Sequence, residues 1–386
     1  MLYFCQKIKS MEKAILLLHI SLCFFACKKT EVVEQQVSNS SDLIEYAKGL
    51  QIEKYDGFYV MHVTTPWPNA EKGFQYVLAK SIDLVPDSLK NVSYIQIPIQ
   101  KVIPTSTTHI SSIVLLNEEN STVAFPHLDY ISSPKVRSLI DQGKIKEVAD
   151  KDEVNFELTL DLDPDVVVAH SMQSNNPKFD QLEKAGIPII YNGDWVEQTP
   201  LGKAEWIKFF GVLYDRYDES KLFFDQVVKE YNTTKELVAN VIHEPTVMSG
   251  AIYQDIWYAP QGESWMAQFI KDAKGNYLWA NASGTGSLSL SFEEVFEKAQ
   301  NATYWIGPGQ FESFVDLQNA NKHYTEFSAF QNRKVYSYAI KKGAKGGSIF
   351  YEDAPNRPDL ILKDLVYILH PEVLKNYQPN FIQALQ

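Results

Sequence analysis

Residues 166–191 read VVVAHSMQSNNPKFDQLEKAGIPIIY and carry the clearest fold signal in the chain. The apolar run 166–169 is typical of a buried strand, and residues 177–186 have the apolar spacing of a helix that ends at Gly186. Residues 187–191 are again almost wholly apolar. A strand, a helix and a strand in this order form a right-handed unit with parallel strands. The sequence therefore predicts an α/β fold.

The segment before this unit contains further apolar stretches. They are expected to form strands or short buried segments, and they are GFYVMHVTTPW (57–67), YIQIPI (94–99) and SIVLL (112–116). Together with the strand–helix–strand unit, they predict a first α/β lobe over residues 42–200.

The segment after this lobe has the longest helical pattern. Residues 201–214 and 218–242 place apolar residues close to a 3.6-residue period, and Pro245 ends the pattern. A helix of about 25 residues would extend roughly 37 Å, which is long enough to join two lobes. Residues 201–244 are therefore expected to form a helical connection that includes a backbone helix between the lobes.

Residues 245–386 alternate strand and helix patterns a second time. The expected elements are strands within 246–253, 303–308 and 333–338, and helices within 264–275, 291–299 and 358–369. Asn-Phe-Glu at 155–157 and Ser-Phe-Glu at 291–293 each combine a helix-capping residue with a carboxylate in the first turn. The predicted fold has two α/β lobes with mostly parallel sheets, joined by one long backbone helix.

The N-terminus has the features of an export signal. Three lysines precede the apolar run AILLLHISLCFFA (14–26), which is shorter than the roughly 20 residues that cross a bilayer. Ala26 before Cys27 resembles the cleavage box of bacterial lipoproteins, in which Cys27 is lipidated; a plain secretory signal is the alternative. Either Met1 or Met11 is a suitable start. We expect a signal peptide and lipobox over residues 1–27 and a flexible tether over 28–41.

Composition excludes several classes of protein. All three cysteines of the 386-residue chain lie within its first 27 residues, so the body has neither a disulfide nor a Cys-ligated metal site. The net charge is −12, and removal of residues 1–26 takes away three Lys and one Glu to leave −14. With no basic block, nucleic acid is not an expected partner.

Six short motifs occur in order along the chain. They are STTH (106–109), NFELTLDLDPDV (155–166), AGIP (185–188), PLGKAEWI (200–207), GSLSLSFE (286–293) and RPDLILKDLVYILHPE (357–372). This order resembles the substrate-binding proteins of bacterial ABC importers for iron-siderophores, haem and cobalamin, over roughly residues 48–376. A departure is TVAFPH (122–127), where the family usually has a Gly-containing strand near the cleft entrance, so the resemblance does not identify the ligand.

The resemblance implies two lobes around a ligand cleft and partnership with an ABC permease and its ATPase. It also implies that Glu157 and Glu293, one on each lobe, dock to arginines of the permease. The alternative is that both carboxylates only stabilise helix N-termini.

Ligand contacts are expected from aromatic residues at strand ends, because sites between lobes are apolar and aromatic with a few polar groups. The candidates are Trp195, Tyr253, Trp257, Tyr258 and Trp279, with His109 and Glu197 as polar candidates. Flat aromatic faces suit a corrin, a porphyrin or a catecholate. For each of these residues a purely structural position is the alternative.

No enzyme motif is present in the sequence: it lacks Gly-x-Ser-x-Gly, a phosphate loop and His-Glu-x-x-His. The histidines form no His-x-x-His or His-x-x-x-His pair, so no metal site is indicated. We expect a monomeric, exported bacterial lipoprotein on the periplasmic side, anchored to the membrane only by its lipid. It would bind an iron complex (siderophore or haem) or a corrinoid in the interlobe cleft and deliver it to the permease. The alternatives are a surface lipoprotein that passes its ligand to an outer-membrane receptor and a receptor for bare metal ions.

Overall fold

The computed structural model describes residues 41–150, 153–172 and 176–386. The expected signal peptide, Cys27 and residues 28–40 of the expected tether lie outside these residues. None of the helices among the described residues is long and apolar enough to cross a membrane.

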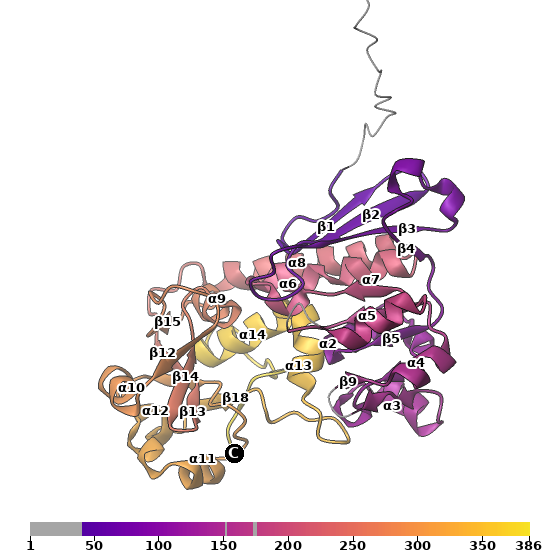
Figure 1. Cartoon of the computed structure of the whole chain (residues 1–386). Helices are drawn as coiled ribbons and strands as arrows, with labels where there is room; N and C mark the ends of the chain where they lie inside the picture. Colours follow the sequence, from indigo (N-terminus) through magenta and orange to yellow (C-terminus); the bar gives the residue numbers. More distant parts are fainter. Residues whose placement is uncertain (1–40, 151–152, 173–175) are drawn as a thin grey trace, which may run out of the picture. The chain divides into compact units, whose positions relative to one another are not determined.

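A four-stranded sheet opens the described part of the chain (Figure 1). Its strands, in spatial order, are β1 (Leu50–Lys54), β2 (Phe58–Val63), β3 (Phe74–Ala79) and β4 (Ser93–Gln96). The first two pairings are antiparallel and β3 pairs with β4 in parallel. Residues 57–67 and 94–99 thus contain strands as expected, but the mostly parallel sheets of the prediction do not include this one.

The first lobe is built on a three-stranded parallel sheet. Its strands are β5 (Val102–Pro104), β10 (Val166–Ala169) and β11 (Ile189–Tyr191), with β10 in the middle. The helices of this lobe are α2 (Thr107–Leu115), α3 (Pro134–Asp141), α4 (Phe156–Leu162) and α5 (Pro177–Lys184). Short strands β6 (Ala124–Phe125), β7 (Lys146–Glu147), β8 (Ala149–Asp150) and β9 (Glu153–Val154) complete it. The predicted strand–helix–strand unit is confirmed.

Residues 112–116 are not a strand. They lie in and just after the second half of α2, in which Ile110 and Ile113 are fully buried and Leu116 is almost fully buried. These three residues are spaced by three, so one helical face carries them into the core. A run of five residues is too short to distinguish this helical spacing from a buried strand.

Three helices connect the lobes, and they are α6 (Pro200–Glu205), α7 (Ile207–Leu213) and α8 (Tyr217–Val238). The 22-residue α8 is the predicted backbone helix, although it ends at Val238 and not near Ile242. Its buried residues include Phe224, Val227 and Tyr231, at the predicted helical spacing. It packs against α7 and against α14 (Pro358–Leu369) of the second lobe.

The second lobe contains two sheets. The first has the order β15 (Asn276–Tyr277), β12 (Thr246–Ser249), β17 (Tyr304–Ile306), β18 (Val335–Ser337) and β19 (Gln383–Ala384), and only β19 is antiparallel. The second is antiparallel and consists of β13 (Ala251–Tyr253), β14 (Ile256–Pro260) and β16 (Ser287–Leu290). The helices, besides α14, are α9 (Trp265–Asp272), α10 (Phe292–Ala299), α11 (Phe314–Ala320), α12 (Ser328–Gln331) and α13 (Ile349–Asp353).

Gly250 divides the strand predicted at 246–253 into two. Its φ is +87°, a conformation that residues with a Cβ rarely adopt, and a Cβ there would lie 1.9 Å from the carbonyl oxygen of Tyr258. The chain therefore leaves the parallel sheet after β12 and enters the β13–β14 hairpin. This turn lies at the carboxyl end of the parallel strands.

The two lobes also contact each other through α13. The carboxylate of Glu352 accepts the backbone N–H groups of Ser132 and Ser133 at 2.6 and 2.8 Å. The side chains of Ser112 and Asn356 hydrogen-bond at 3.1 to 3.3 Å. The predicted class of fold is confirmed: two α/β lobes joined by one long helix.

Candidate functional site

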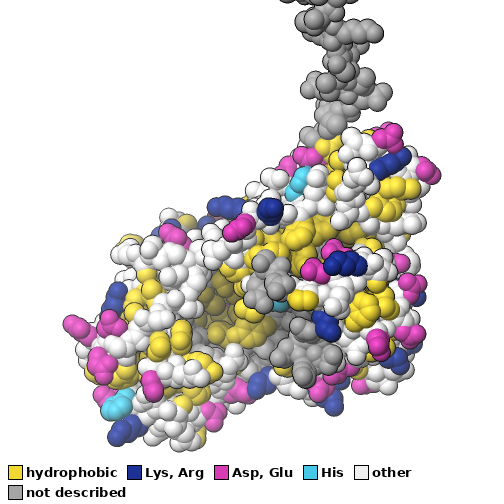
Figure 2. All heavy atoms as spheres, viewed as in Figure 1, with side chains coloured by type: hydrophobic (Ala, Val, Ile, Leu, Met, Phe, Trp, Pro, Cys, Tyr) yellow, Lys and Arg dark blue, Asp and Glu magenta, His cyan; other side chains and the backbone are white. Residues whose placement is uncertain are grey.

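A cavity of about 610 Å³ lies at the carboxyl end of the parallel strands in the second lobe. Ser249 at the end of β12, Gly307 after β17 and Tyr338 after β18 all line it. Figure 2 shows the molecular face hollowed between the lobes, with hydrophobic side chains in the hollow. Open α/β sheets bind ligands at the carboxyl ends of their strands, and the volume suits a small molecule.

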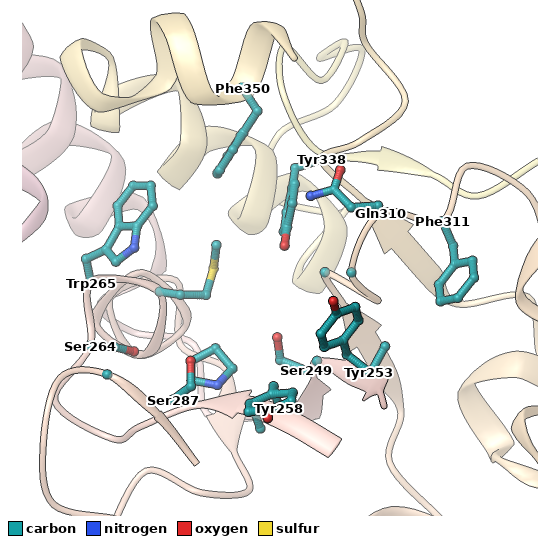
Figure 3. Close-up of a pocket in the computed structure, with 18 of the residues that line it drawn as sticks. Ser249, Tyr253, Tyr258, Ser264, Trp265, Ser287, Gln310, Phe311, Tyr338 and Phe350 are labelled. Atoms are coloured by element: carbon teal, nitrogen blue, oxygen red, sulfur yellow. The ribbon is translucent and has the colours of Figure 1, made fainter. Parts of the chain in front are cut away.

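Aromatic side chains dominate the wall of this cavity. Figure 3 shows the rings of Tyr258, Trp265 and Tyr338 on different sides of one open space. The seven aromatic lining residues are Tyr253, Tyr258, Trp265, Phe311, Tyr338, Phe350 and Tyr351. The rings of Tyr338 and Phe350 are stacked at 4.6 Å, whereas Tyr253 is 66% exposed. The cavity thus offers flat faces on which a planar ligand can stack.

The lining is electrically neutral. Among the described residues it contains no Lys, Arg, His, Asp or Glu, and its other polar side chains are Ser249, Ser264, Thr285, Ser287 and Gln310. Burial raises the pKa of Tyr338, so its phenol stays protonated at neutral pH. The cavity can stack on a ligand and form hydrogen bonds with it, but its walls supply no ion pair.

A group of polar side chains occupies the corresponding edge of the first lobe. These residues follow the carboxyl ends of β5, β10 and β11, and we name them the first-lobe polar cluster: His109, His170, Asn192, Asp194 and Trp195. Of the ten buried side-chain polar atoms without a hydrogen-bond partner among the described residues, six belong to it. They are both ring nitrogens of His109, Nδ1 of His170, Nδ2 of Asn192, Oδ1 of Asp194 and Nε1 of Trp195.

An unsatisfied buried polar atom typically costs about 1–3 kcal/mol, so six at one edge are an unusual concentration. Burial lowers the pKa of His109 to about 4, against the opposing effect of Asp194. Burial also lowers the pKa of His170. Both imidazoles are therefore neutral at pH 7, and each has one donor and one acceptor nitrogen. The described residues contain no group of three or more His, Cys, Asp or Glu side chains placed to hold a metal ion, so the cluster is suited to hydrogen bonding.

Lys203 lies between the polar cluster and the cavity. Its Nζ donates to the backbone oxygen of Asp194 at 2.9 Å and lies 5.4 Å from the centre of the Trp265 ring. Because Asp194 belongs to the cluster and Trp265 lines the cavity, the two features are neighbours.

Of the aromatic residues predicted to contact ligand in the second lobe, Tyr253 and Tyr258 line the cavity, while Trp257 and Trp279 do not. Trp257 is fully buried, stacks on Trp305 at 5.4 Å and donates its indole N–H to the Ser249 oxygen. Successive residues of a strand point to opposite faces, so only one of Trp257 and Tyr258 can face the cavity.

None of the first-lobe candidates lines the cavity: two belong to the polar cluster and one makes structural contacts. Trp195 and His109 belong to the polar cluster and do not line the cavity. The Glu197 carboxylate accepts the backbone N–H groups of Lys48 and Gly49 and the indole N–H of Trp206. Its contacts therefore hold the start of β1 against the connecting helices.

Sequence reasoning missed most of the cavity wall. Tyr338 directly follows the strand that ends at Ser337, so the strand-end rule could have found it. Trp265 begins α9 after the capping residue Ser264, and Phe350 lies on α13, far along the chain. No local signal in the sequence marks the last two as neighbours.

Glu157 and Glu293 are exposed in the first turns of α4 and α10. Each helix is capped by the residue just before it, because Asn155 accepts the Leu158 N–H and Ser291 that of Glu294. The predicted capping motifs are confirmed, and both carboxylates are accessible.

These features describe a two-lobed α/β protein with an aromatic cavity in one lobe and a buried polar cluster in the other. A family model described as "Periplasmic binding protein" matches residues 102–340, more than half of the chain, and the chain therefore belongs to this family. Its members are the non-enzymatic substrate-binding proteins of ABC importers for iron, haem and vitamin B12. A permease and a small-molecule ligand are the partners that membership implies.

Two uncharacterized lipoproteins of Methanocaldococcus jannaschii are similar over most of the chain. The first is 24% identical in sequence, and the alignment covers 89% of this chain and 85% of the relative. The second is 25% identical, and the alignment covers 93% of this chain and 95% of the relative. A periplasmic heme binding protein from Pseudomonas aeruginosa superimposes with a TM-score of 0.57 at 14% identity, over 75% of this chain and 98% of its own. A possible iron-binding protein from Staphylococcus epidermidis superimposes with a TM-score of 0.54 at 16% sequence identity, over 71% of this chain and 99% of its own. These structures support the fold.

Proposed function

We propose that the chain is a lipid-anchored substrate-binding protein that holds an iron complex (siderophore or haem) or a corrinoid and delivers it to an ABC permease and its ATPase. The observation that carries the ligand assignment is the aromatic cavity of the second lobe beside the first-lobe polar cluster. A planar ring system stacks on the former, and its polar substituents satisfy the latter. The names of the similar structures, which include iron and heme binding proteins, support this class of ligand.

The ligand contacts that we propose come from both lobes. Tyr253 and Tyr258 stack on the ligand together with Trp265, and His109 and Trp195 hydrogen-bond to it. Trp257 and Glu197 are assigned a supporting part because they hydrogen-bond within the protein, and Trp279 because it does not line the cavity. We place the lobes at residues 42–200 and 245–386, with 201–244 as their connection, and we expect a monomer.

The anchor is proposed to be a lipid on Cys27. The sequence around Cys27 supports this, and so do the names of the two relatives, both called lipoproteins. The mature protein would be tethered on the periplasmic side or, in a cell with one membrane, outside it. Mass spectrometry of the membrane-extracted protein should find Cys27 modified and N-terminal, whereas an unmodified N-terminus elsewhere would refute the anchor.

The permease contacts are proposed to be Glu157 and Glu293. Changing both to Ala should abolish uptake of ligand into vesicles that contain the permease and leave ligand affinity unchanged. A matched control changes Glu236, which is exposed on α8. Undiminished uptake in the double variant would contradict this docking.

Fluorescence titration of the soluble chain from residue 28 onward tests the function as a whole. Haem, a corrinoid, ferric siderophores and bare Zn²⁺ are added in turn, with correction for light absorbed by the ligand. We expect saturable tryptophan quenching by at least one organic complex at micromolar or tighter affinity, because Trp265 lines the cavity. Silence with every complex would refute the proposal, and a response to Zn²⁺ alone would favour a metal-ion receptor.

A further inference from the structure

The absence of charge from the cavity wall bears on which ligands can enter it. The described lining residues provide seven aromatic rings, hydroxyl groups and one amide, with no ionised side chain. A ligand that carries carboxylates or phenolates must lose water from these groups as the cavity encloses it. Without a cation to pair with, a buried charge costs several kcal/mol.

The nearest cation does not compensate for this. Lys203 is only 8% exposed and does not line the cavity. Its ammonium donates to the Asp194 backbone and sits by the Trp265 ring, and burial lowers its pKa.

Two acidic residues are next to lining residues in the chain. Glu352 and Asp353 directly follow the lining residues Phe350 and Tyr351 on α13. In the first-lobe polar cluster, burial lowers the pKa of both histidines, so neither supplies a cation at neutral pH. None of these residues therefore offers a positive charge to an anion in the cavity.

The available hydrogen-bonding groups suit neutral substituents. The first-lobe polar cluster contains buried N–H donors of Asn192 and Trp195 and a buried acceptor oxygen of Asp194, all without a hydrogen-bond partner among the described residues. A carboxamide satisfies both kinds, because it carries a carbonyl oxygen and two N–H groups. A carboxylate can only accept hydrogen bonds, so it leaves Asp194 unsatisfied and repels it.

We propose that the site selects a planar or ring-shaped metal complex without net negative charge, neutral or cationic, whose substituents are amides or hydroxyls. The inference rests on the proposed function and narrows it, since it places polyanionic chelates outside the preferred ligands. The cavity walls recognise the ring, and the missing cation sets the charge selectivity.

Two pairs of probes differ in charge, and the first pair also keeps the ring the same. The first pair is a corrinoid with amide side chains and the same corrin ring with free carboxylates. The second is a cationic ferric trihydroxamate and an anionic ferric tricatecholate. The soluble chain from residue 28 onward is titrated with each by calorimetry. We expect the uncharged or cationic member of at least one pair to bind at least about tenfold more tightly than its anionic partner, equivalent to about 1.4 kcal/mol.

Equal or tighter binding of the anionic members would overturn the charge selectivity and leave the proposed function in place. Binding of none of the four probes, nor of haem, would overturn both. These outcomes distinguish a failure of the inference from a failure of the function.

A pair of variants tests the cause of the selectivity. Gln310 is an exposed lining residue whose amide donates to the Tyr351 hydroxyl. Gln310→Lys adds a cation at the cavity, and Gln310→Met removes the same hydrogen bond without adding charge. We expect Gln310→Lys to tighten binding of the anionic probes several-fold relative to Gln310→Met. If the two variants bind the anionic probes equally, charge in the wall does not set the selectivity.

Discussion

The interlobe contact of Glu352 leads to a prediction about pH. This side chain is fully buried, and its carboxylate accepts two backbone N–H groups from Ser132 and Ser133 of the first lobe. Burial raises the pKa of Glu352 to about 7, with a smaller raising effect from Asp353, and outweighs the two hydrogen bonds, which lower it. We predict that Glu352→Gln flattens the dependence of stability on pH.

The sign follows from the two pKa values. The ordinary pKa of Glu is 4.5 and that of Glu352 in the folded protein about 7. Between these values the folded state holds a proton that the unfolded state has lost, so stability is greatest below 4.5 and falls as pH rises to 7. The difference is equivalent to about 3 kcal/mol in the free energy of unfolding. Gln cannot titrate, so the variant lacks this pH-dependent contribution to stability. Its amide has a single acceptor oxygen, so it accepts the N–H groups of Ser132 and Ser133 less well than the carboxylate does.

Urea unfolding of wild type and Glu352→Gln at several pH values from about 4.5 to about 8 measures the effect, with tryptophan fluorescence as the signal. We expect the stability of wild type relative to the variant to fall by about 3 kcal/mol over this range. Glu236→Gln, an exposed change on α8, is the control and should follow wild type throughout. Parallel pH profiles for wild type and Glu352→Gln would refute the reasoning.

Three further predictions concern single residues. Gly250→Ala should lower the free energy of unfolding in urea by about 2 kcal/mol or more, because the added Cβ clashes with Tyr258. The control Gly346→Ala, also at positive φ but with open space around it, should cost only about 1 kcal/mol. Equal losses would contradict the clash with Tyr258. Trp257→Ala should lower the free energy of unfolding by about 3–5 kcal/mol, because Trp257 is buried in the core. Tyr258→Ala should weaken ligand binding with little loss of stability, because Tyr258 lines the cavity. The reverse result would contradict the assignment of Trp257 to the core face of β14 and of Tyr258 to the cavity face. Glu205→Ala should destabilise by about 3–5 kcal/mol, because it removes the carboxylate that pairs with the buried ammonium of Lys208 at 2.7 Å and accepts the backbone N–H groups of residues 45–47. A loss below about 1 kcal/mol in thermal or urea unfolding would contradict this.

The predictable parts of the fold were those in which one short segment decides its own structure. The apolar runs at 166–169 and 187–191 have no polar face, so they form strands buried on both sides, and the helix between them forces a parallel pairing. Asn155 and Ser291 cap helices through bonds to residues three positions later. Such contacts are local and therefore visible in the sequence.

The mixed, mostly antiparallel sheet at residues 50–96 was not predictable by the same reasoning. Alternation in residues 58–63 indicates a strand, but its partners are set by packing on the connecting helices. Ile52 and Met61 share a core with Trp206 and Phe209, which are far away along the chain. The sequence pattern indicates that a strand exists and says nothing about which neighbour it pairs with.

The candidate site was predictable only in part, for a similar reason. A strand end with an aromatic residue identifies Tyr253 and Tyr258 as candidates, but it cannot decide that Trp257 faces the core and Tyr258 the cavity. Trp265 and Phe350 are brought together, with ring centres 6.0 Å apart, by the packing of two helices. That distance is a tertiary property with no trace in either local sequence.

The central claim is that a ligand binds at the second-lobe cavity beside the first-lobe polar cluster. Calorimetric titration of the soluble chain from residue 28 onward, with the amide corrinoid and with haem, tests it most directly when repeated on Tyr258→Ala and Trp265→Ala. We predict saturable one-to-one binding of at least one ligand by the wild type and a loss of about tenfold or more in affinity in each variant, equivalent to about 1.4 kcal/mol or more per ring removed. Binding that both variants retain at full strength would place the ligand elsewhere and contradict the account.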